Sequence, residues 1–469
     1  MQEAILNIVA KANAYLSDYI LIFLLVGVGL FYSVKTRFVQ VRCFGEGMKK
    51  VFGNIKLRGG KQEGGLSSFQ ALATAIAAQV GTGNIVGASG AILVGGPGAI
   101  FWMWIIAFLG MATIYAEAVL AQETRTVDEN GNVAGGPVYY IRKAFSGGFG
   151  KFLSVFFSVA VILALGFMGC MVQSNSIAES CNTAFGIPGW TVGLILAIIS
   201  AIIFIGGIQR IASVTEKMVP IMACLFLAGG LVILACRIQF LPKTIVMIFG
   251  YAFTPNALIG GGIGYALKTA ISQGAKRGLF SNEAGMGSTP HAHAMANVEK
   301  PHDQGVVAMI GVFIDTFVVL TMTALVVITC LYTGNGVLAG LEGEAYLAAT
   351  SGAAAVVSKT SAMQIAVGSV FGTGFGNIFV AICLLFFAFS TILGWNFFGK
   401  VNVEYLSKKS KTAVVIYSVV AIAFIFLGTI LKNDLVWELT DFFNYLMVLP
   451  NAIALFALAK LVKKNSDNK

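Results

Sequence analysis

The stretch SSFQALATAIAAQVGTGNIVGASGAILVGG, residues Ser67 to Gly96, is long enough to cross a lipid bilayer but is interrupted at its centre. About 20 apolar residues span the hydrocarbon core. Gly81-Thr82-Gly83-Asn84 places two glycines and two small polar residues where the depth should be greatest. A glycine inside a helix costs about 1 kcal/mol relative to alanine. We therefore expect a transmembrane helix that is discontinuous near 80–84, lining a cavity or buried in protein, because lipid cannot satisfy free backbone groups.

The composition is that of an all-α polytopic membrane protein. Hydrophobic residues make up 57% of the 469 residues and charged residues only 11%, whereas soluble proteins carry about 25% charged residues. The net charge of +10 does not indicate nucleic-acid binding, because basic residues crowd the first loop, from Lys35 to Lys61. That loop is predicted to be cytoplasmic and the N-terminus external.

About eleven transmembrane segments are expected, and an odd number puts the C-terminus, with Lys460, Lys463 and Lys464, in the cytoplasm. A glycine-rich hinge is expected at 59–65, a turn at 128–131 and an external excursion with a short helix at 333–362. The predicted segments are 19–34, 69–95, 98–122, 152–182, 188–207, 216–236, 257–297, 305–332, 364–399, 412–431 and 435–461.

A second interruption lies five segments after the first. GLFSNEAGMGSTP, from Gly278 to Pro290, combines Gly285-x-Gly287 with small polar residues and a proline, which predicts a discontinuous helix near 280–288. Two interrupted segments at corresponding positions of two halves are typical of a transporter site. Five is odd, so the halves have opposite topology. On spacing alone, we divide the chain into an extra N-terminal helix and basic loop (1–66) and two inverted five-helix repeats (67–243 and 244–469).

The two breaks favour a small zwitterion with a bound cation. Exposed N–H groups suit a carboxylate, and freed carbonyls suit sodium, with further oxygens available from Thr82, Asn84, Ser281 and Asn282. The competing interpretation is a glycine-rich helix-packing surface. A dinucleotide site is disfavoured, because the glycine spacing is wrong and no strand precedes it.

Polar residues in two further segments are candidates for the same site. Gln173 and Asn175 could reach a ligand or hydrogen-bond a neighbouring helix. Ser390 and Thr391 could complete a cation site or bond back to their own helix. Trp395 could close the pocket or anchor at the membrane interface.

Three acids and two histidines within or near the segments complete the candidate set. We interpret Glu283 as the acid of the second break, Asp315 as facing a partner helix, and Glu117 as pairing with loop cations. His291 and His293 are interpreted as a helix-end pair near cytoplasmic headgroups rather than a metal site. The seven cysteines lack C-x-x-C spacing and are interpreted as small buried hydrophobic residues, not as disulfides or metal ligands. No catalytic constellation stands out, so no enzyme activity is expected.

Seven long motifs resemble the alanine/glycine:cation (sodium:alanine) symporter family. The resemblance runs from about Ser67 to Trp395 and is carried by VGTGNIVGAS, VGGPGAIFWMW, GMATIYAEAVLA, TVDENGNVAGGPVYY, MVQSNS, KRGLFSNEAGMGSTP and STILGW. It implies a leucine-transporter-like fold with a 5+5 inverted repeat and one extra N-terminal helix. It also implies import of small neutral amino acids, chiefly alanine and glycine, with co-transported Na⁺ or sometimes H⁺.

The resemblance also implies roles for individual residues. The substrate carboxylate would meet Thr82 and Gly83, and its ammonium the wall formed by Phe280 and the carbonyls of Ser281–Gly285. The other substrate contacts would be Gln173, Asn175, Thr391 and Trp395. Sodium would be held by Ala77, Val80, Ser390 and Thr391, with Asn84 in a second site.

The expected function is therefore sodium-coupled symport of alanine or glycine across the cytoplasmic membrane, with no resident cofactor. The alternatives are a proton-coupled or differently selective carrier, for example of glutamine or serine, then a passive channel or an amino-acid sensor. Phe280 and Trp395 over a glycine-lined backbone leave room for a methyl group, although pocket fit discriminates only about 10–200-fold per methylene.

Overall fold

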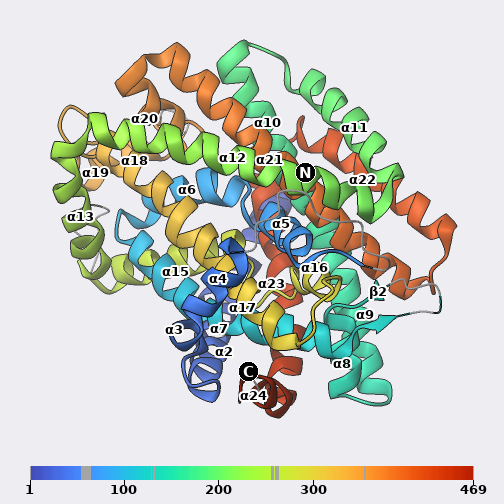
Figure 1. Ribbon diagram of the computed structural model, residues 1–469. Coiled ribbons are helices and arrows are strands. Elements are labelled where there is room, and N and C mark those ends of the chain that lie inside the picture. Colours follow the sequence, from blue (N-terminus) through green and yellow to red (C-terminus); the bar gives the residue numbers. More distant parts are fainter. Residues whose placement is uncertain are drawn as a thin grey trace.

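The computed structural model describes residues 2–53, 65–127, 129, 133–254, 258, 263–352 and 355–467. The expected hinge, apart from Gly65, and most of the expected turn at 128–131 lie outside the described residues. The strands β1 (Thr126–Val127) and β2 (Val133–Ala134) pair antiparallel on either side of that turn. Nearly all other described elements are helices (Figure 1).

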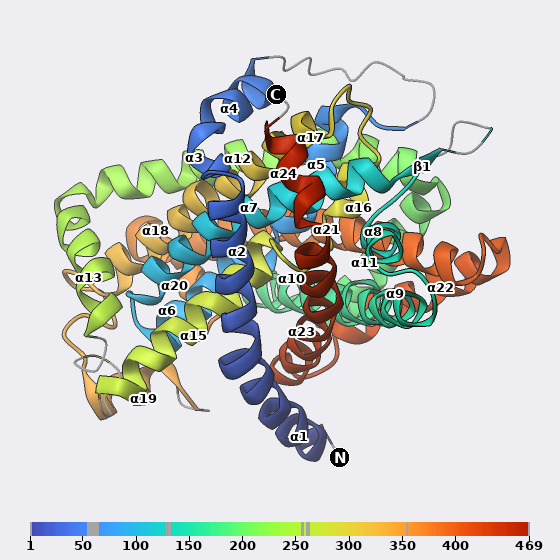
Figure 2. The same cartoon turned by 90° about the horizontal axis from the view of Figure 1, so that it is seen from below.

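Residues 2–35 form one long helical rod, after which the chain turns at Arg37 and Phe38. It consists of α1 (Gln2–Tyr15), a π-helical stretch (Leu16–Leu21) and α2 (Ile22–Lys35), and is longer than the predicted segment 19–34. After it come α3 (Val39–Arg42) and α4 (Phe44–Phe52). The termini lie at opposite ends of the helical bundle, with α4 and the C-terminus at the same end (Figure 2).

The first predicted repeat contains the first interrupted segment and the helices that follow it. The elements are α5 (Ser68–Gln79), α6 (Ala88–Gly95), α7 (Ala99–Thr124), α8 (Pro137–Ala144), α9 (Gly148–Val161), α10 (Cys170–Phe185), α11 (Gly189–Ile205) and α12 (Gly207–Cys236). π-Helical stretches join α5 to α6 (Gly83–Gly87) and α9 to α10 (Ile162–Gly169).

The second predicted repeat contains the second interrupted segment. A 3-10 turn (Ile238–Phe240) and the start of α13 (Leu241–Phe253) precede residue 244, where this repeat begins. The other elements are α15 (Ile263–Asn282), α16 (Pro290–Ala294), α17 (Pro301–Val312), a π-helical stretch (Phe313–Leu320), α18 (Thr321–Leu331), α19 (Gly343–Thr350), α20 (Ala362–Phe371), α21 (Thr373–Leu406), α22 (Lys411–Gly428), α23 (Asn433–Ala457) and α24 (Ala459–Asp467).

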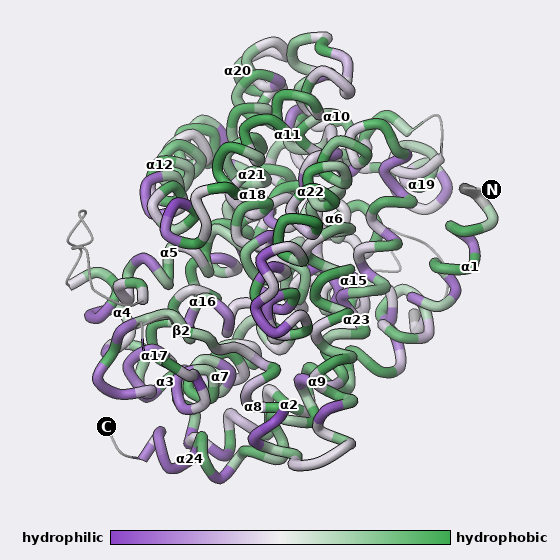
Figure 3. Tube along the Cα trace, turned by 90° about the vertical axis from the view of Figure 1, so that its right-hand side faces the viewer, coloured by the Kyte–Doolittle hydropathy of each residue, from purple (hydrophilic) through white to green (hydrophobic). Residues whose placement is uncertain are grey.

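Eight helices of the described residues are long and apolar enough to span a membrane, or up to nine with the bent pair α5–α6. Helix α11 is shorter than that limit, and α15 carries Lys268, Lys276 and Arg277. The count of eleven stays a prediction. Hydrophobic residues run along the long helices, and hydrophilic residues gather at α24 and neighbouring helix ends (Figure 3). Large apolar side chains such as Phe23 and Ile205 are exposed, as a lipid environment requires.

Two regions differ from the sequence expectation, one a predicted transmembrane segment and the other a predicted loop. The predicted segment 364–399 is two helices, because Gly372 (φ +89°) ends α20 before α21 begins. Helix α13 lies in a region predicted as an external loop. Helix α19 agrees with the short helix expected in the excursion.

Candidate functional site

The first interruption is a bend of 45° between two helical halves, Ser68–Gln79 and Gly83–Gly95. Helix α5 ends at Gln79, and Val80 leaves the helical region with ψ +86°. The side chain of Asn84 stabilises the bend, because its Oδ1 accepts a hydrogen bond from the N–H of Gly81 at 3.0 Å. The discontinuity predicted near 80–84 is confirmed.

The second interruption is wider and has left-handed backbone. Helix α15 ends at Asn282, and Glu283 (φ +57°), Gly285 (+94°) and Gly287 (+77°) follow before α16 begins at Pro290. Glycine adopts this conformation without steric cost. For a residue with a side chain, such as Glu283, the left-handed conformation costs of the order of 1–3 kcal/mol, and residues held in it cluster at functional sites.

The two interruptions touch each other in the interior. Gln79 Nε2 donates to the carbonyl of Asn282 at 2.7 Å, so the last residues of α5 and α15 are joined. A Cβ on Gly83 would lie 3.1 Å from Phe280 Cδ1 and 3.1 Å from the Cα of Ser281. A glycine at 83 therefore permits the two backbones to approach closely.

Two polar groups beside the first interruption have no hydrogen-bond partner among the described residues. The N–H of Thr82 donates to Gln173 Oε1 at 3.1 Å, which brings the two side chains together. Thr82 Oγ1 and Gln173 Nε2 are both buried without a partner. A buried polar group left in this way costs about 1–3 kcal/mol. Both groups can donate hydrogen bonds, as a carboxylate ligand requires.

Four oxygen atoms converge on the carboxyl end of α5. Thr391 Oγ1 lies 2.8 Å from the carbonyl oxygen of Ala77 and 3.5 Å from that of Val80. Ser390 Oγ lies 3.3 Å from the Ala77 oxygen. Carbonyls freed at an unwound helix coordinate Na⁺ in transporters of this general design. The structure thus brings together the four residues expected to hold sodium.

Asp315 joins the two interruptions. Its Oδ1 accepts from Asn84 Nδ2 at 2.7 Å, and Ser281 Oγ donates to Oδ1 and Oδ2 at 3.1 and 3.0 Å. The sequence indicated only a partner helix for this acid. The carboxylate lies within the π-helical stretch Phe313–Leu320 and contacts the residue expected at a second sodium site.

Aromatic rings wall the region. Phe280 packs edge-on against Trp395, with ring centroids 5.8 Å apart, and against Trp437 at 4.9 Å. Trp395 Nε1 donates to Glu283 Oε1 at 2.5 Å, so it contacts the second interruption rather than the membrane interface. The Arg277 guanidinium lies over the ring of Trp437, 4.8 Å from its centroid, and pairs with Asp441 at 3.0 Å.

Glu117 was misplaced by the sequence interpretation. It does not pair with loop cations. Its carboxylate accepts hydrogen bonds from the backbone N–H of Gly285 (3.1 Å) and Gly287 (2.9 Å) and from Asn451 Nδ2 (2.6 Å). Helix α7 therefore supplies the anion that satisfies the second interruption. The signal in the sequence was an acid within an apolar helix. Gly285 is therefore held by Glu117 through its N–H, and its carbonyl also accepts a hydrogen bond from Asn451 Nδ2.

Asn175 does not join the other candidates. Its amide donates to the carbonyls of Gly428 and Leu431 and accepts from Asn433, which ties α10 to the α22–α23 turn. Residues two apart in a helix point to opposite sides, so Gln173 and Asn175 cannot face the same site. The helix–helix interpretation applies to Asn175, and we leave it out of the site.

The predicted position of the two histidines was also wrong. His291 and His293 are both buried rather than near headgroups. His291 hydrogen-bonds Asn402 at 2.8 Å, whereas His293 Nδ1 contacts Gln304 at 2.8 Å. They have separate partners and do not form a pair.

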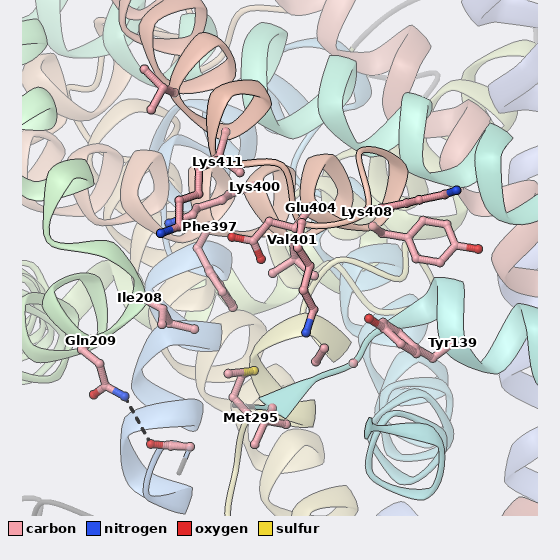
Figure 4. Close-up of a pocket in the computed structure, with 18 residues that line it drawn as sticks. Tyr139, Ile208, Gln209, Met295, Phe397, Lys400, Val401, Glu404, Lys408 and Lys411 are labelled. Atoms are coloured by element: carbon pink, nitrogen blue, oxygen red, sulfur yellow. Dashed lines mark hydrogen bonds between the residues drawn. The ribbon is translucent and has the colours of Figure 1, made fainter. Parts of the chain in front are cut away.

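A cavity of about 890 Å³ lies beyond the second interruption, between the ends of α16, α21 and the start of α22. Its lining includes Met295, Phe397, Glu404 and lysines 400, 408 and 411 (Figure 4), together with Lys409. None of the residues expected to bind substrate or sodium lines it. It is a space on the α4 and α24 side of the molecule rather than the site itself.

The sequence matches the model of the sodium:alanine symporter family over residues 2–468. The chain belongs to this family. It is 39% identical to the sodium/alanine symporter AgcS of Methanococcus maripaludis over 97% of this chain and 95% of that one. It is 37% identical to the probable sodium/glutamine symporter GlnT of Bacillus subtilis over 98% and 90%. The solved structure of MhsT with L-phenylalanine covers 87% of this chain and 100% of its own, with a TM-score of 0.58 at 13% identity.

Family and fold together establish the class of this symporter-family protein. It is a multi-pass membrane transporter with a leucine-transporter-like fold, and it is not an enzyme. The family resemblance and the fold class predicted from the sequence are confirmed.

Proposed function

We propose that this protein is a sodium-coupled symporter that imports small neutral amino acids, alanine and glycine, across the cytoplasmic membrane. The proposal rests on one observation. Two buried donors without partners and a group of four oxygens lie at the same helix break. Thr82 Oγ1 and Gln173 Nε2 offer hydrogen bonds to a carboxylate. Ala77, Val80, Ser390 and Thr391 offer oxygens to a cation at the same break.

The amino acid would lie between the two interruptions. Its carboxylate would meet Thr82, Gln173 and the N–H of Gly83, and its ammonium the carbonyls of Ser281–Gly285. Phe280 and Trp395 would bound the side chain. Thr391 packs directly against Gly81, where a Cβ would lie 2.4 Å from Thr391 Oγ1. Together, the two aromatic rings and this glycine-lined backbone would favour alanine and glycine over larger residues.

Sodium would occupy the oxygens of Ala77, Val80, Ser390 and Thr391. A second cation would take Asn84 together with Asp315, whose negative charge offsets the cost of a cation in the membrane interior. Coupling then means that bound sodium raises the affinity for the amino acid and the reverse, by the same factor.

Transport would proceed by alternating access between the two repeats, 67–243 and 244–469, around this midplane site. With the N-terminus outside and the C-terminus in the cytoplasm, the cavity at Met295 and Phe397 lies on the cytoplasmic side. Trp437, which packs against Phe280 and has Arg277 over its ring, would close the site on the external side together with Asp441.

A second candidate is proton coupling at the same site. Asp315 favours it, because this buried carboxylate contacts residues of both interruptions and could carry a proton in place of a cation's charge. Selectivity for glutamine or serine would alter the substrate but not this mechanism.

The test is uptake of labelled alanine into proteoliposomes under an inward sodium gradient, an inward proton gradient or neither. Concentrative uptake only with sodium supports the first candidate, and uptake only with protons supports the second. Uptake indifferent to both gradients would overturn coupled transport. Competition with each standard amino acid then ranks the substrates.

A further inference from the structure

We propose that Cys43, Glu46 and His302 form a binding site for a divalent transition metal, best suited to Zn²⁺, away from the transport site. One oxygen, one sulfur and one ring nitrogen of these side chains all lie within 4.8 Å of one another. Cys43 and Glu46 flank the start of α4, and His302 is at the start of α17. No local pattern marks Cys43 as a ligand, because His302 is distant from it in the chain.

The spacing of the atoms fits one tetrahedral ion. His302 Nε2 lies 3.3 Å from Glu46 Oε1. Two ligands bound to zinc at about 2.0–2.2 Å in tetrahedral geometry are about 3.3 Å apart. The Cys43 sulfur completes the triangle after a closure of about 1 Å, since a Zn–S bond is about 2.3 Å. The fourth position is left to water.

The other nitrogen of His302 is already held. Tyr115, on α7, lies with its hydroxyl oxygen 2.7 Å from His302 Nδ1. Metal-ligating histidines commonly have their second ring nitrogen bound in this way, which fixes the ring and directs Nε2 to the ion. Here that direction is toward Glu46.

The donor set selects the metal and balances its charge. Thiolate with imidazole favours zinc over magnesium or calcium, which prefer oxygen ligands. A thiolate and a carboxylate together carry two negative charges, which neutralise a divalent cation at a largely buried position. The Cys43 thiol would release its proton to solvent on binding. Glu46 is one-third exposed and provides access.

Occupancy would fasten α4 to α17. These helices already pack closely, because a Cβ on Gly47 would lie 2.9 Å from the Val306 carbonyl oxygen. Lys50 on α4 also pairs with Asp303 on α17 at 3.0 Å. Helix α4 follows the N-terminal rod, so the ion would fix that rod to the core of the bundle.

The experiment uses purified full-length protein with its affinity tag removed and Co²⁺ as a spectroscopic probe for Zn²⁺. We expect one equivalent of Co²⁺ to produce a thiolate-to-cobalt charge-transfer absorption that Zn²⁺ displaces. Cys43→Ser should abolish the absorption, while Cys224→Ser, at an exposed cysteine elsewhere, should retain it. Zn²⁺ should raise the melting temperature of the wild type but not of Cys43→Ser.

Two further variants separate metal binding from a simple His302–Glu46 ion pair. Glu46→Gln should weaken Zn²⁺ binding at least tenfold. Tyr115→Phe should weaken it roughly 10–100-fold, as loss of an outer hydrogen bond does at other sites. Absence of the charge-transfer absorption in the wild type, or its persistence in Cys43→Ser, would overturn the proposal, and the ion pair alone would then describe the cluster.

Discussion

At the scale of single residues, the site depends on a few side chains, and residues close to them in sequence have different hydrogen-bond partners. Gln173 contacts the first interruption, while Asn175, two residues later on α10, bonds the α22–α23 turn. Thr82 has a buried hydroxyl without a partner in the described structure. These are the positions at which conservative substitutions should separate binding from folding.

Thr82→Val and Gln173→Ala should each weaken alanine binding by about 10-fold to 150-fold, because a hydrogen bond to a charged group is worth about 1.5–3 kcal/mol. Equilibrium binding of labelled alanine measures this. Ser174→Ala is the matched control, since among the described residues Ser174 Oγ bonds the Met171 carbonyl of its own helix. Unchanged affinity in both variants would place the carboxylate elsewhere.

Gly81→Ala should abolish alanine binding, because the added methyl would lie 2.4 Å from Thr391 Oγ1 and 3.0 Å from Gln173 Oε1. The control is Gly90→Ala, on the same interrupted segment, where the nearest atom would be 3.5 Å away. Wild-type binding by purified Gly81→Ala would contradict the tight packing of Gly81 against Thr391 and Gln173.

Ser390→Ala and Thr391→Val should raise the sodium concentration required for half-maximal alanine binding at least several-fold, because each removes an oxygen near the Ala77 carbonyl. Alanine binding at saturating sodium should recover in Ser390→Ala. A sodium dependence equal to that of the wild type in both variants would remove these residues from the cation site.

At the scale of elements, the second interruption is held open from outside the segment. Glu117 on α7 and Asn451 on α23 satisfy the backbone groups of Gly285 and Gly287. A carboxylate suits this position because both of its oxygens accept hydrogen bonds. The amide of a glutamine would present a donor toward a backbone donor.

Glu117→Gln should therefore lower the melting temperature and weaken alanine binding together, by an amount corresponding to about 1.5–3 kcal/mol. Thermal unfolding in detergent and binding on the same preparation measure both. Glu123→Gln is the control on the same helix, because in the described part of the chain Glu123 accepts an exposed hydrogen bond from Asn465. If Glu117→Gln leaves both quantities unchanged, the carboxylate does not support the interruption.

A feature could be predicted from the sequence where neighbouring residues determine it, and could not where distant segments determine it. Gly81 and Gly83, or Gly285 and Pro290, mark an interruption locally, so both discontinuities could be expected. The contact of Asp315 with Asn84 and Ser281 depends on packing between distant segments and left no local pattern. The separation of Gln173 from Asn175 could have been predicted, because helical periodicity sends residues two apart to opposite sides. The sequence showed Glu117 as an acid within an apolar helix, but it did not predict the hydrogen-bond partners of this acid.

At the scale of the whole molecule, the two interruptions form one junction. Gln79 bonds the Asn282 carbonyl, and Asp315 contacts both segments. A ligand or ion bound at either interruption thus acts on both predicted repeats. This is the physical basis for coupling, since a site shared by two bodies can favour one of their arrangements.

The most direct test of this account is equilibrium binding of labelled alanine to the purified protein in sodium and in an equimolar inert cation, with sodium binding measured reciprocally. We predict that sodium raises alanine affinity and that alanine raises sodium affinity by the same factor. Alanine affinity that is identical with and without sodium would contradict the account.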